Sequence, residues 1–192
     1  MRFAGDGIAF EVDQQEWVVA QKWDDTTAYR RGIGMLGDSS AVDYVAVRKD
    51  ELYFIESKVY MGPAGDPSHD AIVHKRPQLS ELPDKVGRKV RDTIAGVVAA
   101  YRSAAVGDEE WPWLDKCVRA LLERSKPVHV VVWIVEPGSR PGEPESKQKA
   151  RKTERNDRIR KALVWLTRRV SVVNPVRGPC PTGIKVTRPT RP

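Results

Sequence analysis

The stretch that decides the fold runs from Ala41 to Lys58 and reads Ala41-Val-Asp-Tyr-Val-Ala-Val-Arg48, then Lys49-Asp50, then Glu51-Leu-Tyr-Phe-Ile-Glu-Ser-Lys58. Two runs rich in β-branched and aromatic residues surround a polar turn, which is the pattern of a β-hairpin. With a turn of two or four residues, residues whose numbers sum to 99 face each other. Asp43 then lies opposite Glu56, and Lys58 shares their face because strand side chains alternate with a period of two.

Two carboxylates and one ammonium group thus gather at one end of an otherwise apolar face. Like charges opposite one another destabilise a sheet, and a charge on a core face is costly unless it is paired. A divalent cation gives a reason for the arrangement, because Mg²⁺ or Mn²⁺ is commonly held by one or two carboxylates with waters and phosphate oxygens. In phosphodiester hydrolysis the ion polarises the phosphoryl group, and an ammonium group orients water or stabilises negative charge. Asp43 and Glu56 are therefore candidate metal ligands, and Lys58 is the candidate for the ammonium role.

The alternative interpretation is structural: Asp43 could cap a strand, while Glu56 and Lys58 form a solvated edge. However, the opposite face of the hairpin is also apolar, with Tyr44, Ala46, Tyr53 and Ile55. Such a pattern predicts strands that are covered on both sides. A solvated face then explains three clustered charges poorly, and we favour the metal site.

The segments Val42-Asp43-Tyr44 and Glu56-Ser57-Lys58 resemble the signature of the PD-(D/E)xK nucleases, the restriction-endonuclease-like superfamily. In that family an Asp on one strand precedes Glu-x-Lys on the next, and Val42 stands where a proline is usual. The resemblance implies an α/β fold with a mixed central β-sheet flanked by helices. It further implies metal-dependent hydrolysis of DNA with Mg²⁺ or Mn²⁺, catalytic roles for Asp43, Glu56 and Lys58, a backbone carbonyl ligand from Ser57, and a homodimer.

The family often adds a glutamate from its first helix to the metal site. Glu11, in Gly7-Ile-Ala-Phe-Glu11, is our first choice for this ligand, and Glu16 is the alternative. Either glutamate could equally be an ordinary acid in the first turn of a helix, where the helix dipole favours negative charge.

The remaining pattern matches the family's order of helix, three strands, helix and strand. The best helix begins with an N-cap at Ser80 and carries Lys85, Arg88 and Lys89, which could face phosphate but more commonly would be solvated. An apolar strand follows a helical segment, which favours parallel pairing. The predicted elements are a first helix over 7–23, a short strand within 31–37, the hairpin, a loop over 62–77, the helix from Ser80, a helix over 113–124, a strand over 128–135, a loop over 137–144, a basic helix over 146–169 and a strand over 170–173.

Composition predicts one domain over residues 1–174, followed by a basic, proline-rich tail over 175–192 that is extended or disordered. Cys117 and Cys180 lack metal-ligand spacing, so we expect free thiols. No apolar run approaches the ~20 residues that span a bilayer, and no signal peptide is visible. We therefore expect a cytoplasmic protein that does not associate with membranes.

A net positive charge is confined to the last quarter of the chain. Residues 145–192 hold 14 Lys and Arg against three acids, a net of +11, whereas the whole chain has a net charge of +7. This asymmetry predicts contact with nucleic acid, DNA in the first instance, although basic helices are often only solvated surface. The candidate binding residues are Arg151, Lys152, Arg155 and Arg158.

Three questions of function stay open at this level. An RNA-directed hydrolase, or an inactive nucleic-acid-binding or scaffold protein of the same fold, shares these features. No segment resembles a base-reading module, so selection of DNA shape, ends or junctions, or recruitment by a partner protein, is as consistent with the sequence as site-specific cleavage. Defence against foreign DNA and DNA repair both fit, because a fold alone does not decide a pathway.

Overall fold

A five-stranded mixed sheet forms the centre of the protein. The computed structural model describes residues 2–5, 8–60, 76–136, 144–175, 178, 180 and 183–187. The strand order is β3-β4-β5-β6-β7. The strands β3 (Trp17–Lys22), β4 (Tyr44–Arg48) and β5 (Glu51–Val59) are antiparallel neighbours, whereas β6 (Val128–Val135) and β7 (Val170–Val173) extend the sheet in parallel. The predicted α/β class and mixed central sheet are confirmed.

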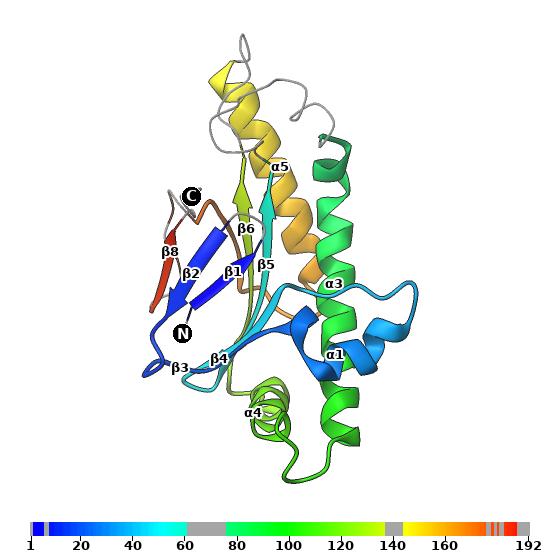
Figure 1. Cartoon of the computed structure of the whole chain (residues 1–192). Coiled ribbons are helices and arrows are strands. Elements are labelled where there is room, and N and C mark those ends of the chain that lie inside the picture. Colours follow the sequence, from blue (N-terminus) through cyan, green and yellow to red (C-terminus); the bar gives the residue numbers. More distant parts are fainter. Residues whose placement is uncertain are drawn as a thin grey trace, which may run out of the picture.

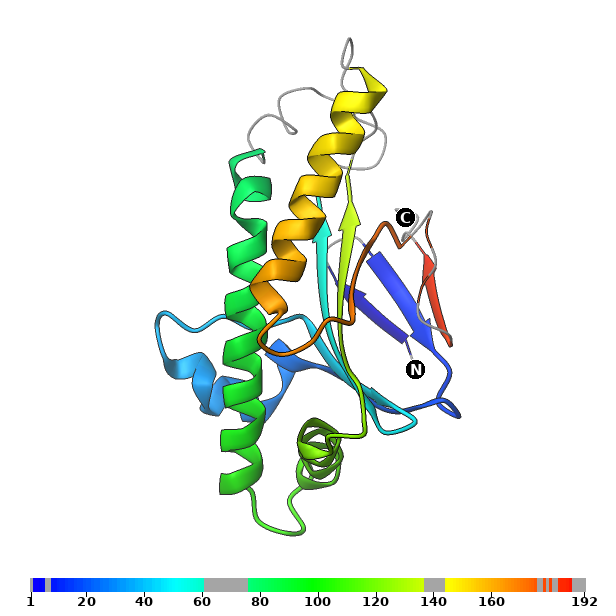
Figure 2. The same ribbon diagram turned by 180° about the vertical axis from the view of Figure 1, so that it is seen from behind.

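Helices cover one face of this sheet. The helices α3 (Arg76–Ser103) and α4 (Trp111–Leu122) connect β5 to β6, and α5 (Glu145–Leu163) connects β6 to β7. Figures 1 and 2 show α3 and α5 side by side along β5 and β6, with α4 at the other end of the sheet. Alternate residues of β4, β5 and β6 pack against the helices, and this first core includes Val45, Phe54, Val132, Val86, Val90, Leu114, Ile159 and Leu163.

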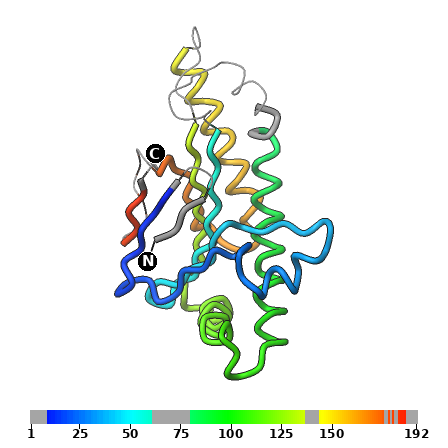
Figure 3. Tube along the Cα trace, viewed as in Figure 1, coloured from blue at the N-terminus to red at the C-terminus, as the bar shows by residue number. Residues whose placement is uncertain are grey.

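A second, three-stranded antiparallel sheet covers the opposite face. It has the order β1-β2-β8 and consists of β1 (Arg2–Gly5), β2 (Ile8–Val12) and β8 (Ile184–Thr187). Phe10 packs edge-on against Tyr44 and Trp133 of the main sheet, with ring centroids 4.6 and 5.2 Å apart. Figure 3 shows β2, in blue from early in the sequence, beside β8, in red from late in the sequence. Both faces of the hairpin are therefore covered, as its two apolar faces predicted.

The register of the hairpin is the predicted one. Tyr44 pairs with Ile55 and Val45 with Phe54, so paired numbers sum to 99. Lys49 and Asp50 form a two-residue turn and both have positive φ, 48° and 66°, which the tight turns of β-hairpins require. The predicted bounds of β6 and of β7, and the parallel pairing of β6 with β5, are also confirmed.

The region before the hairpin differs from the prediction. Residues 7–23 do not form a helix: β2 and β3 occupy most of this segment, and Glu11 is exposed between buried Phe10 and Val12, which is the period of two that marks a strand. Residues 31–37 do not form a strand either. A 3-10 helix η1 (Trp23–Asp25), a short helix α1 (Thr27–Arg31) and a 3-10 helix η2 (Ile33–Met35) lead from β3 towards β4.

Three element boundaries are shifted. Helix α3 begins at Arg76, so Ser80 lies inside it rather than at its N-cap, and Pro83 lies in the helix interior. Helix α4 begins and ends two residues before its predicted bounds, and α5 ends at Leu163 because the chain must turn before β7. Residues 184–187, within the predicted tail, form the strand β8, which pairs with β2. The predicted loops fall almost wholly on residues 61–75 and 137–143, outside the described part of the chain.

No helix in the described ranges is both long enough and apolar enough to cross a bilayer. Cys117 is buried and Cys180 is half-buried, and both are free thiols, as the absence of metal-ligand spacing predicted.

Gly96 on α3 provides a test of the packing beside the hairpin. An added Cβ would lie 2.7 Å from Ile33 Cγ2 and 2.8 Å from Trp23 Cζ2. Gly→Ala in a helix interior ordinarily stabilises by ~0.5–1 kcal/mol, but overpacking costs ~1–3 kcal/mol. We expect Gly96→Ala to lower the free energy of unfolding in urea by about 1 kcal/mol or more. Gly87→Ala, with an added Cβ at 3.4 Å from Ala162, is the control and should be neutral or stabilising; equal stabilisation by both changes would contradict this packing.

Candidate active site

Asp43 lies one residue before β4. Hydrogen bonds to its own backbone carbonyl and from the amides of the two residues Ser40 and Val42 hold it there. The amide of Trp23 donates to the Asp43 carbonyl at 2.9 Å. The amide of Val42 donates to Thr93 Oγ1 of α3 at 3.0 Å, and the amide of Ser40 donates to Asp92 Oδ2 at 3.1 Å. Helix α3 therefore fixes the segment that presents the Asp43 carboxylate.

The Asp43 carboxylate is turned towards β5. Its Oδ2 atom accepts hydrogen bonds from the Ser57 amide at 2.7 Å and from Ser57 Oγ at 2.9 Å. Its Oδ1 atom lies 3.9 Å from Lys89 Nζ, beyond hydrogen-bond distance. One oxygen thus fixes the orientation of the carboxylate, and the other is directed towards the charged cluster.

Glu56 is the centre of the charged cluster and is completely buried on the helix-covered face of β5. Lys58 Nζ lies 2.8 Å from its Oε1 atom, and Lys89 Nζ lies 2.9 Å from Oε1 and 3.1 Å from Oε2. Burial raises the pKa of Glu56, the nearby Asp43 carboxylate raises it further, and the two lysines lower it, with a net rise. A buried carboxylate with a raised pKa is a frequent property of functional sites.

Lys89 is the member of the cluster that the sequence did not reveal. Because it is charged, Lys89 was expected on the solvated side of the helix. However, it comes one residue before buried Val90 and four residues before buried Thr93. Its side chain is 22% exposed, so its stem lies along the protein while the ammonium group reaches the two carboxylates. The adjacency to the apolar stripe of α3 was the available signal.

The donor set of the cluster suits a hard divalent cation. Asp43 Oδ1 lies beyond hydrogen-bond distance of Lys89, and Glu56 Oε1 is buried and receives no donor with hydrogen-bond geometry within the described part of the chain, although both ammonium groups are close to it. Two carboxylates with waters and phosphate oxygens are a usual environment for Mg²⁺. No group of three or more acids, histidines or cysteines that could hold a metal occurs among the described residues. The residues that the structure describes here offer two carboxylate groups as ligands.

Neither candidate for an additional glutamate is brought to this cluster. Glu11 lies on β2 with an exposed side chain, while its neighbours Phe10 and Val12 pack into the second core on the opposite face of the main sheet. Glu16 precedes β3 and forms an ion pair with Arg48 at 2.7 Å. The assignment of Glu11 depended on a first helix over 7–23, which is absent from the described structure.

Ser57 contacts Asp43 through its amide and hydroxyl, while the carbonyl-ligand role that the resemblance implies stays a prediction. Its side chain is buried, and both its amide and its hydroxyl donate to Asp43. These bonds make Ser57 a positioning residue for the carboxylate of Asp43.

The predicted nucleic-acid-binding residues of α5 divide into two groups. Arg155 Nη1 lies 2.9 Å from Glu136 Oε2, and Lys152 Nζ lies 3.2 Å from Glu136 Oε1. Burial alone would raise the pKa of Glu136, but the hydrogen bond and charge of Arg155, with the charge of Lys152, together lower it. Arg155 and Lys152 are thus ion-paired with Glu136, which is the residue after the last one of β6.

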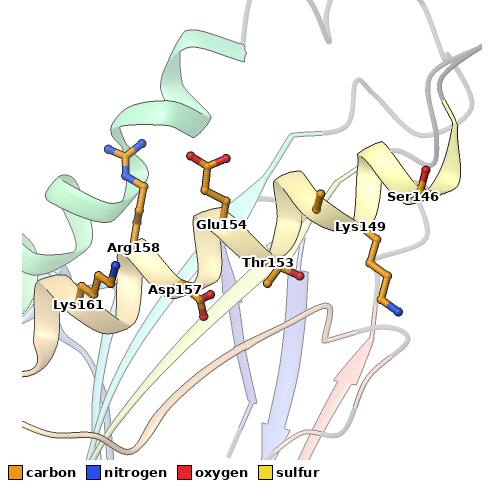
Figure 4. Close-up of a pocket in the computed structure, with 8 residues that line it drawn as sticks. Ser146, Lys149, Thr153, Glu154, Asp157, Arg158 and Lys161 are labelled. Carbon is orange, nitrogen blue, oxygen red and sulfur yellow. The ribbon is translucent and has the colours of Figure 1, made fainter.

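Arg151 and Arg158 are exposed on α5. Arg158 borders an open depression of about 760 Å³ along the outer side of the helix, together with Ser146, Lys149, Ala150, Thr153, Glu154, Asp157 and Lys161. Figure 4 shows Glu154 and Arg158 on one side of this surface and Lys149 and Asp157 on the other. The four predicted residues therefore do not form a single surface, and charges of both signs line the depression.

Comparison with known proteins gives a narrow result. No protein-family model matches the chain, and no solved structure matches it. A segment of 105 residues, 53% of this chain, is 31% identical to the cysteine–tRNA ligase of Neisseria meningitidis serogroup A. The chain spans 15% of that ligase's length, so the match assigns neither a family nor an activity.

Glu56 and Glu136 should have opposite effects on the pH dependence of stability. The folded pKa of Glu56 is raised, so its contribution is fully present below the ordinary value of 4.5 and is lost as pH rises through the folded value. The folded pKa of Glu136 is lowered, so its contribution is present above 4.5 and is lost as pH falls. In thermal melts with EDTA, Glu56→Gln should therefore gain stability relative to wild type as pH rises, and Glu136→Gln should gain as pH falls. Differences that do not vary with pH would contradict these assignments.

Proposed function

We propose that this protein is a metal-dependent nuclease with a restriction-endonuclease-like core, which hydrolyses the phosphodiester bonds of DNA with Mg²⁺ or Mn²⁺. The observation that carries the proposal is the convergence of Asp43, Glu56 and Lys58 at one end of β5. These three residues resemble the PD-(D/E)xK signature, and Glu56 places a completely buried carboxyl group on a core face, where a purely structural role explains it poorly.

The residues support the following roles. Asp43 and Glu56 would hold the cation, and Ser57 would keep Asp43 in the orientation that directs its Oδ1 atom to the cluster. The bound cation would supply Lewis-acid polarisation of the scissile phosphate. Lys58 would orient the attacking water and stabilise negative charge on the phosphate as the bond from the water oxygen to phosphorus forms. The attacking water would release a proton to solvent, the bond between phosphorus and the leaving sugar oxygen would break, and that oxygen would take a proton from solvent.

Nucleic acid as the substrate is supported by the charge distribution. Residues 145–192 carry a net charge of +11, and α5 with Arg151 and Arg158 on its exposed side is part of this segment. RNA is the second candidate substrate. The partial match to a tRNA ligase is the observation that favours testing it, and tRNA therefore belongs among the substrates.

Cleavage assays test the proposal directly. Supercoiled, linear and single-stranded DNA, and RNA including tRNA, should be incubated with the protein in Mg²⁺, Mn²⁺ or EDTA. We expect cleavage that requires the metal, with DNA the better substrate. Binding without cleavage on every substrate would support an inactive nucleic-acid-binding protein instead. Preferential cleavage of RNA would mean that RNA, and not DNA, is the substrate.

Substitutions in the cluster should abolish this cleavage. Asp43→Asn, Glu56→Gln and Lys58→Met should each reduce the cleavage rate by roughly 10² or more, because groups that act as a unit cannot substitute for one another. Glu51→Gln is the matched control, since it changes a glutamate at the opposite end of the same strand. Circular dichroism of each variant would check that it is folded. Wild-type rates in any one of the three variants would refute this site.

Substitutions in the two groups of cationic residues on α5 should have different effects, one on DNA affinity and the other on stability. Measured on duplex DNA in the Glu56→Gln background, Arg151→Gln with Arg158→Gln should lower the slope of log affinity against log salt by about 0.9 for each phosphate that is no longer neutralised. Arg155→Gln should instead lower the melting temperature, because it removes the closest partner of partly buried Glu136. Arg119→Gln, an exposed arginine of α4, is the control. An unchanged slope in the double variant would leave α5 as scaffold.

A further inference from the structure

Lys89 has a position in the charged cluster that no other described cation shares. Its ammonium group lies 2.9 and 3.1 Å from the two oxygens of Glu56 and 3.9 Å from Asp43 Oδ1. Among the residues that the structure describes, it alone is within ion-pair distance of both carboxylates, since the ion pair of Lys58 in the cluster is with Glu56. Lys89 therefore lies between the same oxygen atoms that a divalent cation would coordinate.

The charges of the cluster balance only with Lys89 in place. Two carboxylates contribute two negative charges, and Lys58 and Lys89 contribute two positive charges. A divalent cation supplies the same two positive charges at once, and it would repel both ammonium groups at this distance. The two carboxylates cannot neutralise both lysines and the cation at the same time. The cation and a lysine therefore compete for the carboxylate oxygens.

Lys89 is the lysine that lies between both carboxylates, and its ammonium group can leave them by movement of its side chain alone. The backbone of α3 is fixed at this point by buried Val86, Val90 and Thr93, so movement is confined to the side chain. That side chain is 22% exposed and has a flexible four-carbon stem. Its ammonium group can therefore exchange a carboxylate partner for solvent or for a phosphate oxygen without any movement of the helix.

We propose that Lys89 is an internal counter-ion of Asp43 and Glu56 that a divalent cation displaces, and that the displaced ammonium group then binds a phosphate of the substrate. This inference rests on the proposed nuclease function. It couples two binding events, because the metal releases a phosphate ligand that is otherwise engaged. By reciprocity, a phosphodiester that holds Lys89 away from the carboxylates strengthens metal binding by the same factor.

Titration calorimetry with Mn²⁺ alone tests the competition. Lys89→Met removes the charge but keeps most of the apolar stem, and we expect it to lower the Kd for Mn²⁺ by about tenfold or more, equivalent to about 1.4 kcal/mol. Lys85→Met is the matched control: it lies one turn earlier on α3, its ammonium group pairs with Glu81 at 2.8 Å, and its Kd should equal that of wild type. If Lys89 were only structural, its loss would leave Mn²⁺ affinity unchanged or weaker.

The outcomes separate this inference from the proposed function. Mn²⁺ binding by wild type with no tighter binding by Lys89→Met overturns the role of Lys89 and leaves the nuclease proposal standing. No Mn²⁺ binding by wild type or by either lysine variant overturns the proposed metal site itself.

A measurement on the unaltered protein covers the case in which Lys89→Met does not fold. Reductive methylation followed by mass spectrometry reports how readily each lysine reacts, and an ammonium group held by two carboxylates reacts slowly. Mn²⁺ should increase the methylation rate of Lys89 several-fold while leaving that of Lys85 unchanged. Equal rates for Lys89 with and without Mn²⁺ would overturn the displacement.

Discussion

The buried carboxyl group of Glu56 is the constraint on which this end of the molecule depends. A carboxylate without solvent must have compensating partners, and here these partners come from β5 itself through Lys58 and from α3 through Lys89. Helix α3 must therefore pack on the hairpin in the position that brings Lys89 to Glu56. The same helix holds the segment before β4 through Thr93 and Asp92, so the placement of Asp43 follows from it. The fold and the candidate site are stabilised by the same contacts.

Glu136 shows that burial alone does not make a functional carboxylate. It follows β6 on the same face of the sheet, yet its pKa is lowered because the planar guanidinium of Arg155 binds both of its oxygens. Glu56 has two point-charge partners, a neighbouring carboxylate and complete burial, and its pKa is raised. Glu136 is thus satisfied by its partners, whereas the partners of Glu56 do not offset the effect of its burial on the pKa.

The sequence predicts well what local pattern determines. The hairpin register follows from alternation and a two-residue turn, and the apolar run of β6 has its predicted bounds. The segment 7–23 was misassigned because its apolar residues are compatible with more than one period, and the choice of Glu11 failed with it. The partner of Lys89 depends on how α3 lies over β5, which no local pattern gives. The strand β8 was missed because it is stabilised by pairing with β2, at the far end of the sequence.

The pairing of β2 with β8 also sets an order of events during folding. The hairpin and α3 are close in the sequence, so the contacts around Glu56 can form while later residues are still being synthesised. The second core needs Ile184 of β8 against the face that carries Tyr44 and Trp133. That face remains incompletely covered until the most distant contact in the chain is made. We infer that the side of the sheet opposite the candidate site closes last, and that a chain which has not reached residue 184 leaves part of the second core uncovered while its charged cluster is already assembled.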